Sequence, residues 1–480
     1  MKRILVVYEN EEFKNQIEYA SQILFGNYCV DYCMVPYSKF NPADCKCDLI
    51  IYYGNNLECD FANIIVTRGS LFGKNYLHKY SLLSNVEFYE GLPVFFTNKS
   101  CDFYFKEKQK KIMFNIDIFQ TIFYFLTCYE EFVFNEYDDK GRFNIENSIL
   151  HKFNLLSRPV VNENICLFIN VLNKRFNMNL ERKDLWSGSE FAVMLSHDVD
   201  IITQHLSFKR EIRLLLSMIL IDRKPRQVFK RISDFINIKI LKVQKDPFDT
   251  FDYIMNMERE KNFKSSFYFM ADRKTYDLKS HRVKEILREI LDNGSEIGFH
   301  PGLNTSNNKE NFKNQLAILE NSIKDTYVSG VRQHYLSFHS SRTWVIQDDC
   351  KLKYDSTACF PEQAGFKVGY CLPYRTYDLT RNSSLDLIEV PLILMEGSLF
   401  DYMNLNYEES VEYIKELIFQ VQKYSGVFAI LWHNSAITNQ YNKDSKQVFK
   451  WLYSYLENQN CIVQSGINVY KMFLGQTYIK

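Results

Sequence analysis

From Phe191 onward, short apolar runs alternate with helical segments, and this alternation constrains the fold of the 480-residue chain more than any other feature. The apolar runs are 192–195, 266–270, 296–299, 328–331, 353–354, 387–392 and 427–431. Segments with helical periodicity, such as 283–292 and 312–324, lie between them. Strands that alternate with helices form parallel sheets. About seven such units in roughly 290 residues predict a closed or distorted (β/α) barrel over 191–480.

The first 135 residues predict a smaller α/β domain. Apolar runs occur at 4–8, 29–35, 49–53, 64–66 and 94–96. A helical pattern spans about 12–25, and 115–134 predicts one apolar, aromatic helix. The domain lacks a Gly-rich phosphate loop, so we assign it no cofactor. Residues 136–190 are mixed and polar, and we expect them to be a connector that packs between the two domains.

Residues 207–245 interrupt the barrel pattern with a helical insertion that is rich in Lys and Arg and has an apolar centre at 214–221. Charge runs usually form solvated faces. We therefore expect a helix packed on the barrel, with its basic face in solvent. The alternative is a basic amphipathic helix that makes peripheral contact with a membrane surface.

Charge and hydropathy exclude some partners. Lys plus Arg and Asp plus Glu both number 58, without the basic excess of a typical nucleic-acid-binding protein. No stretch approaches the roughly 20 apolar residues of a transmembrane helix. The apolar run at 4–8 is too short for a signal peptide, and the twelve scattered Cys resemble buried reduced thiols, so the expected location is cytoplasmic. The oligomeric state stays open.

The predicted strands end in residues capable of chemistry. Asp198 and Asp200 follow the first barrel strand, and side chains two residues apart on an extended chain point the same way. Two neighbouring carboxylates repel each other unless a cation or a shared proton neutralises part of their charge. A divalent metal would leave one carboxylate as ligand and the other as base.

Histidine follows the same pattern. Five of the nine His lie in or beside motifs at strand ends, and we expect them to share one site; they are His197, His300, His334, His339 and His433. Asp and His together suit zinc or another first-row divalent ion, such as cobalt, nickel or manganese.

These motifs resemble, in order, the five motifs of the polysaccharide deacetylase (NodB-homology) domain, carbohydrate esterase family 4 in the broad sense. The resemblance covers roughly 191–480, and it rests on the Asp198–Asp200 pair, His300, Arg332, Asp355 and His433. The wording of the motifs also resembles a bacterial subgroup with an added N-terminal α/β domain of unknown role. One departure concerns the second motif, where Asn304 stands in place of the family's second His. His334 could supply the missing nitrogen, so the third metal ligand is Asn304 or His334.

The resemblance implies a metal-dependent hydrolase that removes an N- or O-acetyl group from a carbohydrate. Asp200, His300 and Asn304 would hold the metal, most simply zinc. Asp198 would act as base, Arg332 would orient it, and His433 would be the proton donor. Tyr335 and Asp355 would contribute to binding the substrate. The alternatives are another amide hydrolase on the same barrel, of deformylase or imidase type, and a catalytically inactive glycan-binding homologue.

Overall fold

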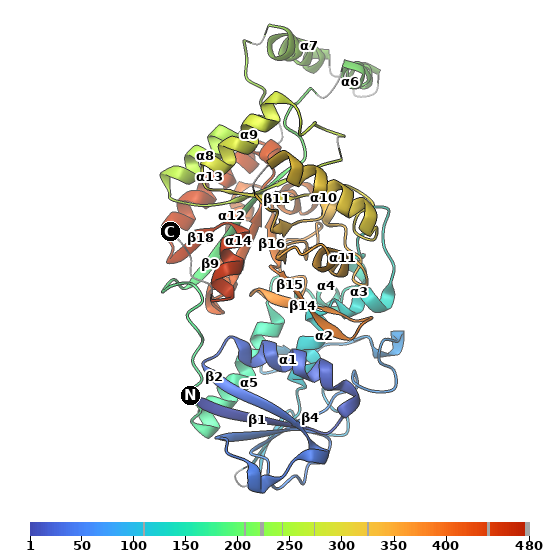
Figure 1. Cartoon of the computed structure of the whole chain (residues 1–480), viewed down its shortest axis with the longest axis vertical. Helices are drawn as coiled ribbons and strands as arrows, with labels where there is room; N and C mark the ends of the chain where they lie inside the picture. Colours follow the sequence, from blue (N-terminus) through green and yellow to red (C-terminus); the bar gives the residue numbers. More distant parts are fainter. Residues whose placement is uncertain are drawn as a thin grey trace.

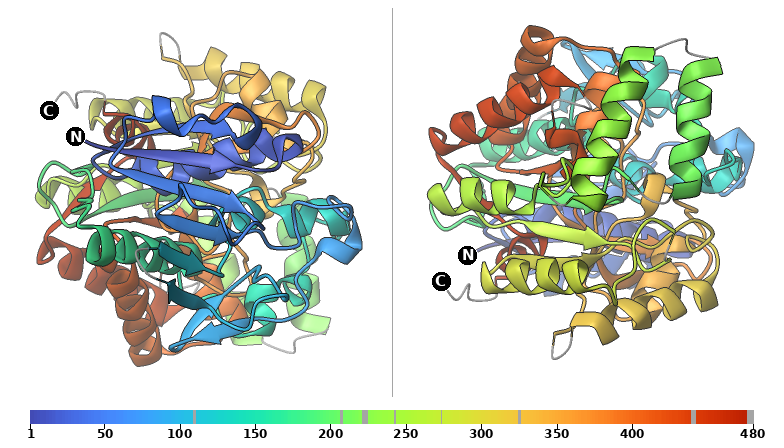
Figure 2. Two further views of the ribbon diagram at one scale, coloured as in Figure 1. Left: turned by 90° about the horizontal axis from the view of Figure 1, so that it is seen from below. Right: turned by 90° about the horizontal axis from the view of Figure 1, so that it is seen from above.

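The computed structural model describes residues 1–108, 111–205, 208–220, 225–241, 243–272, 274–323, 326–438 and 442–475. Three parts follow one another along the longest axis (Figure 1). A small sheet domain built by the N-terminal residues lies at one end, the large sheet lies in the middle, and helices α6 and α7 lie at the other end. Figure 2 gives the views from both ends.

The N-terminal domain is built on a six-stranded sheet with the order β2-β1-β3-β4-β8-β7. Its strands are β1 (Lys2–Tyr8), β2 (Val30–Pro36), β3 (Leu49–Gly54), β4 (Ile64–Thr67), β7 (Phe105–Lys108) and β8 (Lys111–Phe114). All pairings are parallel except that of β7 with β8. The central strands are buried, β1 from Ile4 onward, because they consist mostly of apolar residues, as in parallel sheets that are covered on both faces.

Two predictions for this domain were wrong in detail. The 94–96 run does not join the main sheet, since β6 (Leu92–Val94) forms a hairpin with β5 (Glu87–Tyr89). The expected helix over 115–134 is two helices, α2 (Ile118–Leu126) and α3 (Tyr129–Phe134). Cys128 between them has a φ of 51°, and this left-handed conformation ends α2 and redirects the chain. The expected helix near 12–25 is α1 (Lys14–Gly26).

The large domain is a curled ten-stranded sheet with the order β14-β15-β13-β12-β11-β10-β9-β17-β16, and β18 also pairs with β9. The strands are β9 (Phe191–Val199), β10 (Ser266–Phe269), β11 (Glu296–Phe299), β12 (Gly330–Val331), β13 (Tyr354–Asp355), β14 (Tyr374–Asp378), β15 (Ser383–Glu389), β16 (Leu392–Met395), β17 (Val427–Leu431) and β18 (Cys461–Gln464). Only β14 runs antiparallel to its neighbour. Since β14 and β16 do not pair in the described part of the chain, the barrel is open. The expected α/β class, a distorted barrel after a smaller α/β domain, is confirmed.

Helices of the large domain pack against this sheet (Figure 1). They are α8 (Phe251–Glu260), α9 (His281–Asp292), α10 (Lys309–Ile323), α11 (Thr343–Asp349), α12 (Tyr407–Lys423), α13 (Lys443–Glu457) and α14 (Gly466–Phe473). Their buried side chains recur at helical spacing, as Val283, Ile286, Leu287 and Ile290 do on α9. One apolar stripe on each helix therefore covers the sheet.

The expected connector packs against both domains. It contains α4 (Ile149–Lys152) and α5 (Val160–Phe176). The ring of Phe168 on α5 lies 5.2 Å from that of Phe114 on β8. On the barrel side, the Phe338 N–H donates to the Gly141 carbonyl at 2.8 Å. Gly141 has a φ of 75°, which favours glycine, and a Cβ at this position would lie 2.6 Å from Ser337 Oγ.

The insertion differs from the expected packed helix. It forms α6 (Phe208–Leu220), α7 (Pro225–Phe235) and a π-helical turn, η6 (Ile236–Ile240). Ten large apolar side chains between positions 212 and 243 are exposed, including Leu216, Ile219, Phe229 and Ile240. The expectation of apolar side chains packed on the barrel was wrong for these residues.

All twelve Cys are free thiols. Cys371 is buried as expected, but Cys29 and Cys33 are exposed, because Cys33 points outward from the edge strand β2. Within the described ranges, no helix combines the length and apolar character that would allow it to cross a membrane.

Two carboxyl groups face each other inside the large sheet. Asp355 and Glu389 are register partners on β13 and β15, and both are fully buried. Glu389 accepts hydrogen bonds from Trp344 Nε1 at 3.1 Å and the Ala358 N–H at 3.0 Å, and Asp355 accepts one from Thr357 Oγ1 at 2.5 Å. Burial raises the pKa of Glu389 well above its usual range, and the charge of Asp355 raises it further. Burial raises the pKa of Asp355 to about 6. The two groups therefore share a proton.

This pair predicts a pH effect on stability. Carboxyl groups with raised pKa values destabilise the folded state as pH rises from the unfolded-state pKa to the folded one, here from about 4 to 6 for Asp355. Asp355→Asn replaces the shared proton with a permanent N–H donor. Relative to wild type, we expect this variant to gain unfolding free energy as pH rises from 4 to 8, measured by urea unfolding. Asp31→Asn, at an exposed position, is the matched control. If the difference in unfolding free energy between the variant and wild type stays constant across this pH range, the two carboxyl groups do not share a proton.

Candidate active site

A cavity of about 280 Å³ lies at the carboxyl ends of the barrel strands. Parallel strands bring their carboxyl ends to one edge of a sheet, so residues far apart in sequence meet there. The cavity is lined by Asp198, Asp200, His300, His334, Tyr335, Glu396 and His433, among others.

Three side chains in this cavity form a candidate metal site. His300 Nε2 lies 3.2 Å from Asp200 Oδ1, and His334 Nε2 lies 3.7 Å from Asp200 Oδ2. One ligand atom from each of Asp200, His300 and His334 lies within 4.8 Å of the others. Asp200 follows β9, His300 follows β11 and His334 follows β12, so three strand ends build the group.

The chemistry of these atoms fits a cation. His300 Nδ1 lies 2.6 Å from the Arg332 carbonyl oxygen. Since a carbonyl only accepts, Nδ1 carries the proton and Nε2 is left to bind a cation. Asp200 Oδ1 is buried and accepts no hydrogen bond from the described residues. Two imidazoles and one carboxylate suit zinc or another first-row divalent ion.

The local charges favour a cation at the same place. Burial alone would lower the pKa of His300, but the charges of Asp198 and Asp200 outweigh it and raise that pKa. Burial would also raise the pKa of Asp200, but contacts with His300 and His334 hold it well below its usual range. The carboxylates therefore attract positive charge to His300 Nε2, as either a proton or a metal ion.

Asp198 is the second carboxylate, and a buried arginine holds it. Arg332 Nη1 donates to Asp198 Oδ1 at 3.0 Å and to Ser196 Oγ at 2.8 Å. The other Asp198 oxygen lies 3.6 Å from His300 Nε2. Both Asp198 and Arg332 are almost fully buried. Asp198 is thus fixed beside the candidate metal site and has one oxygen directed toward it.

His433 also lines the cavity, and the carboxylate of Glu396 contacts its ring. Its Nδ1 lies 2.6 Å from Glu396 Oε1, and its Nε2 lies 3.6 Å from Asp200 Oδ2. Burial alone would lower the pKa of His433, but the charge of Glu396 and the hydrogen bond to it, with Asp200 and Asp198, raise it to about 10. His433 is therefore protonated at neutral pH, with Nε2 directed into the cavity.

The mouth of the cavity carries two tyrosines and an arginine. Tyr335 and Tyr402 expose 42% and 43% of their surfaces. Tyr335 has a φ of 60°, an uncommon conformation for a bulky residue, and its ring stacks on His334 at 3.9 Å. Arg142, from the connector, pairs with Asp138 at 2.7 Å and also lines the cavity. The connector thus contributes directly to the site.

Several residues that the sequence singled out lie elsewhere. Asn304 is exposed, has a φ of 63°, and does not line the cavity, whereas His334 does. Asp355 is buried behind Arg332 and pairs with Glu389. The expectation that five His share one site was wrong for His197 and His339. His197 points to the other face of β9, where it contacts Glu258 at 3.1 Å, and the His339 ring lies 4.0 Å from that of Tyr137.

Sequence reasoning missed Glu396, Tyr402 and Arg142. Glu396 had a usable signal, because it directly follows the apolar strand β16, as the other site residues follow theirs. Arg142 had no signal of this kind, because it lies in the connector, far from any barrel strand in sequence.

Comparison with known proteins gives a family match only for the N-terminal part. A family of unknown function (DUF7033) matches residues 5–177. No curated protein matches the chain.

Part of the chain is similar to solved structures. A protein from Mycobacterium smegmatis described as a polysaccharide deacetylase is 14% identical, with a TM-score of 0.41 over 61% of this chain and 95% of that chain. An allantoinase is 10% identical, with a TM-score of 0.41 over 62% and 94%. A CE4 family pseudoenzyme from Bacillus anthracis is 12% identical, with a TM-score of 0.29 over 47% and 61%. Similarity at this level assigns no activity to this chain.

Proposed function

We propose that this protein is a metal-dependent hydrolase that removes an acetyl group from the nitrogen or oxygen of a carbohydrate. The observation that carries the proposal is the convergence of Asp200, His300 and His334 beside Asp198 and His433 in one cavity. A metal site flanked by a fixed carboxylate and a protonated imidazole contains the parts that hydrolysis of an acyl group needs.

Each residue has a role that follows from its contacts. Asp200, His300 and His334 would hold the ion, which when bound polarises the acyl carbonyl and activates water. Asp198 accepts the proton of the attacking water, and the hydrogen bond from Arg332 holds the carboxylate in position. His433 donates a proton from Nε2 to the leaving group, while Glu396 at Nδ1 stabilises the imidazolium.

The shape of the cavity supports a sugar that carries a small acyl group. Its volume of about 280 Å³ is at the lower end of the range for ligand pockets, which suits one sugar unit. Leu336, Met395 and Leu431 line it and offer an apolar surface to a methyl group. The exposed rings of Tyr335 and Tyr402 at the mouth offer flat surfaces for sugar rings.

We would test the proposal by measuring the release of acetate from N-acetylated chitooligosaccharides and from O-acetylated xylan. Allantoin and N-formyl amides would be assayed in parallel, because they are substrates of the other amide hydrolases considered above. Acetate release from either glycan, abolished by Asp198→Asn, would support it. Turnover of only the formyl or cyclic-imide substrates would assign a different hydrolase. Glycan binding without bound metal or turnover would indicate the inactive homologue.

The metal ligands can be tested one by one. We expect His334→Ala to lower zinc affinity by about 10² or more, because it removes one of three ligands, and Asp200→Ala to do the same. Asn304→Ala should keep wild-type affinity, because Asn304 is exposed outside the cavity. Zinc competition titrations with a chromogenic chelator measure these affinities. If Asn304→Ala loses zinc while His334→Ala retains it, the third ligand is Asn304.

Asp198→Asn is the control that separates metal binding from catalysis. It should keep zinc and lower turnover by about 10² to 10⁴, the usual contribution of a general base. Loss of zinc in this variant would instead make Asp198 a metal ligand.

The role of His433 as proton donor predicts a dependence on the leaving group. We expect His433→Ala to lower hydrolysis of an N-acetyl sugar by about 10² or more. The same change should affect an activated acetate ester much less, because its leaving group needs little protonation. Equal losses of kcat on the two substrates would show that His433 positions the substrate or supports the fold.

A further inference from the structure

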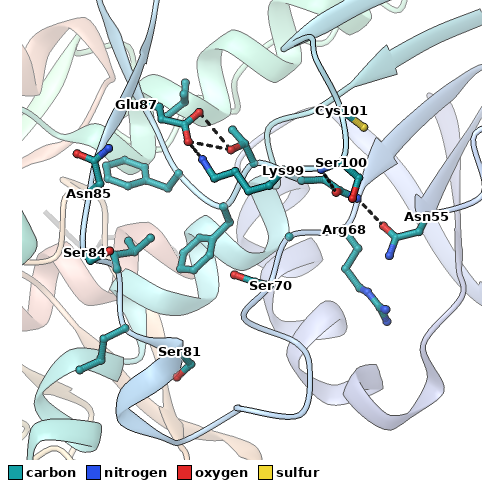
Figure 3. Close-up of a pocket in the computed structure, with 18 of the residues that line it drawn as sticks. Asn55, Arg68, Ser70, Ser81, Ser84, Asn85, Glu87, Lys99, Ser100 and Cys101 are labelled. Carbon is teal, nitrogen blue, oxygen red and sulfur yellow. Dashed lines mark hydrogen bonds and ion pairs between the residues drawn. The ribbon is translucent and has the colours of Figure 1, made fainter.

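A second, larger cavity lies in the N-terminal domain, for which neither the proposed activity nor the family match supplies a role. Its volume is about 730 Å³, within the range of small-molecule sites. It is lined by the loops that follow β3 and β4, at the carboxyl edge of the parallel sheet, and by residues 80–87 and 94–101 (Figure 3). Open α/β sheets bind ligands at this edge.

Buried polar side chains from the segment after β8 hold the loops of this cavity in place. Asn115 Oδ1 accepts the Asn98 N–H at 2.9 Å, and Asn115 Nδ2 donates to the Asn98 carbonyl at 3.2 Å. Asp117 Oδ2 accepts the Gly69 N–H at 2.8 Å, and Gln120 Oε1 accepts the Leu71 N–H at 2.8 Å. A site whose loops are fixed by a second layer of hydrogen bonds is preorganised for binding.

The loops also touch each other closely. Asn98 Nδ2 donates to Asn55 Oδ1 at 3.1 Å, which joins the loop after β3 to residues 94–101. A Cβ on Gly69 would lie 2.5 Å from the Phe96 carbonyl oxygen, so glycine is needed where the loop after β4 passes this segment. The cavity wall is therefore a fixed surface built from three separate parts of the chain.

The charges in the cavity leave one cation without a partner. Lys99 forms an ion pair with Glu87, as Figure 3 shows. Arg68 is half-buried, and its guanidinium forms no ion pair or hydrogen bond with the described residues. Neutral hydrogen-bonding side chains fill much of the remaining wall, among them Asn55, Ser70, Ser84 and Asn85. Such a wall suits many hydroxyl groups and one negative charge.

From this arrangement we infer that the N-terminal cavity binds a hydroxylated small molecule with one anionic group, of the sugar phosphate or sugar acid class. Arg68 binds the anion, and the amide and hydroxyl side chains bind the sugar hydroxyls. The site is distinct from the catalytic cavity, so this inference stands without the proposed activity.

Calorimetric titration of the whole chain with glucose 6-phosphate, glucuronate and glucose tests the inference. At least one of the two anionic probes, glucose 6-phosphate with its phosphate or glucuronate with its carboxylate, should bind at least tenfold more tightly than glucose. Arg68→Gln should weaken that binding at least tenfold. Arg3→Gln removes the same charge at the opposite, amino end of β1 and should leave the affinity unchanged. Asp200→Ala should also leave it unchanged, because Asp200 lies in the catalytic cavity.

Four results would overturn the inference. They are no binding of either anionic probe, equal binding of glucose, wild-type affinity in Arg68→Gln, and loss of binding in Asp200→Ala. If Arg68→Gln fails to fold, judged by its melting temperature, Ser70→Trp provides the same test, because it places an indole in the cavity from an exposed loop position.

The helical insertion carries a second, independent observation. Residues 207–245 contain 11 Lys or Arg and 3 Asp or Glu, whereas the rest of the chain has fewer basic than acidic residues. Helices α6 and α7 lie side by side at one end of the long axis (Figures 1 and 2). Half of the exposed large apolar side chains of the described chain lie in this short segment. On α6, Ile212, Leu216 and Ile219 follow helical spacing. Phe229 and Ile232 on α7 and Ile236 at the start of η6 do the same.

We propose that this insertion docks on a lipid surface that carries negative charge. An apolar helical face enters the boundary between head groups and acyl chains, while Lys and Arg of the same segment bind anionic head groups. The excess of basic over acidic residues in this segment selects a negatively charged surface as the partner.

Co-sedimentation of the whole chain with vesicles tests the proposal. We expect binding to phosphatidylcholine vesicles with 30% phosphatidylserine, at least tenfold weaker binding to phosphatidylcholine alone, and weakening by salt. Phe229→Ser should lower binding at least fivefold, because Phe229 exposes 75% of its surface. Phe419→Ser, at a side chain 61% exposed on α12, is the matched control.

Vesicle binding that ignores lipid charge, or that Phe229→Ser leaves unchanged, would overturn the proposal. A dimer in light scattering that Phe229→Ser dissociates, without vesicle binding, would also overturn it and make the face a contact between copies of this chain.

Discussion

The hydrogen bonds of the buried Arg332 guanidinium are the interactions on which the candidate active site depends. Arg332 sits on the strand end of β12, yet it donates to Ser196 and Asp198 on β9 and to Ser356 after β13. Its carbonyl also fixes the ring of His300. A buried arginine is tolerated only when its donors are satisfied, and here the bond to Asp198 also orients a residue of the candidate site. One residue, through its side chain and its carbonyl, thus links the Asp198 carboxylate, the His300 imidazole and three strands.

The alternation of side chains along β9 explains why the neighbouring polar residues have different fates. Asp198 faces the cavity, whereas His197 faces the opposite side, where Glu258 and Tyr453 surround it. His197 therefore joins α8 and α13 to the strand and does not touch the metal site. Its Nδ1 also contacts the Trp432 carbonyl, next to His433, so this structural network supports the catalytic edge from behind.

The sequence predicted what depends on strand periodicity and failed where contacts are long-range. The barrel was predictable from its apolar runs. The site residues Asp198, Asp200, His300 and His433 each come after such a run, and parallel strands gather residues of this kind at one edge. The choice between Asn304 and His334 depends on loop conformation, since the positive φ of Asn304 lies in a loop whose path no periodicity describes. Arg142 reaches the cavity from the connector, next to Gly141, where the connector approaches the loop after β12. The break at Cys128 between α2 and α3 was likewise not predictable, because the sequence has no glycine or proline at this point.

The catalytic edge also anchors the insertion. Asn434, directly after His433, donates through Nδ2 to the carbonyls of Ile201 and Phe248, where the chain leaves the barrel and returns. Thr203 and Asp246 join the two ends of the insertion by a hydrogen bond of 2.5 Å. The helices that expose their apolar side chains are thereby tied to the strand ends that carry Asp200 and His433. If the insertion docks on a lipid surface as proposed, these hydrogen bonds join the docked segment to the strand ends of the candidate active site.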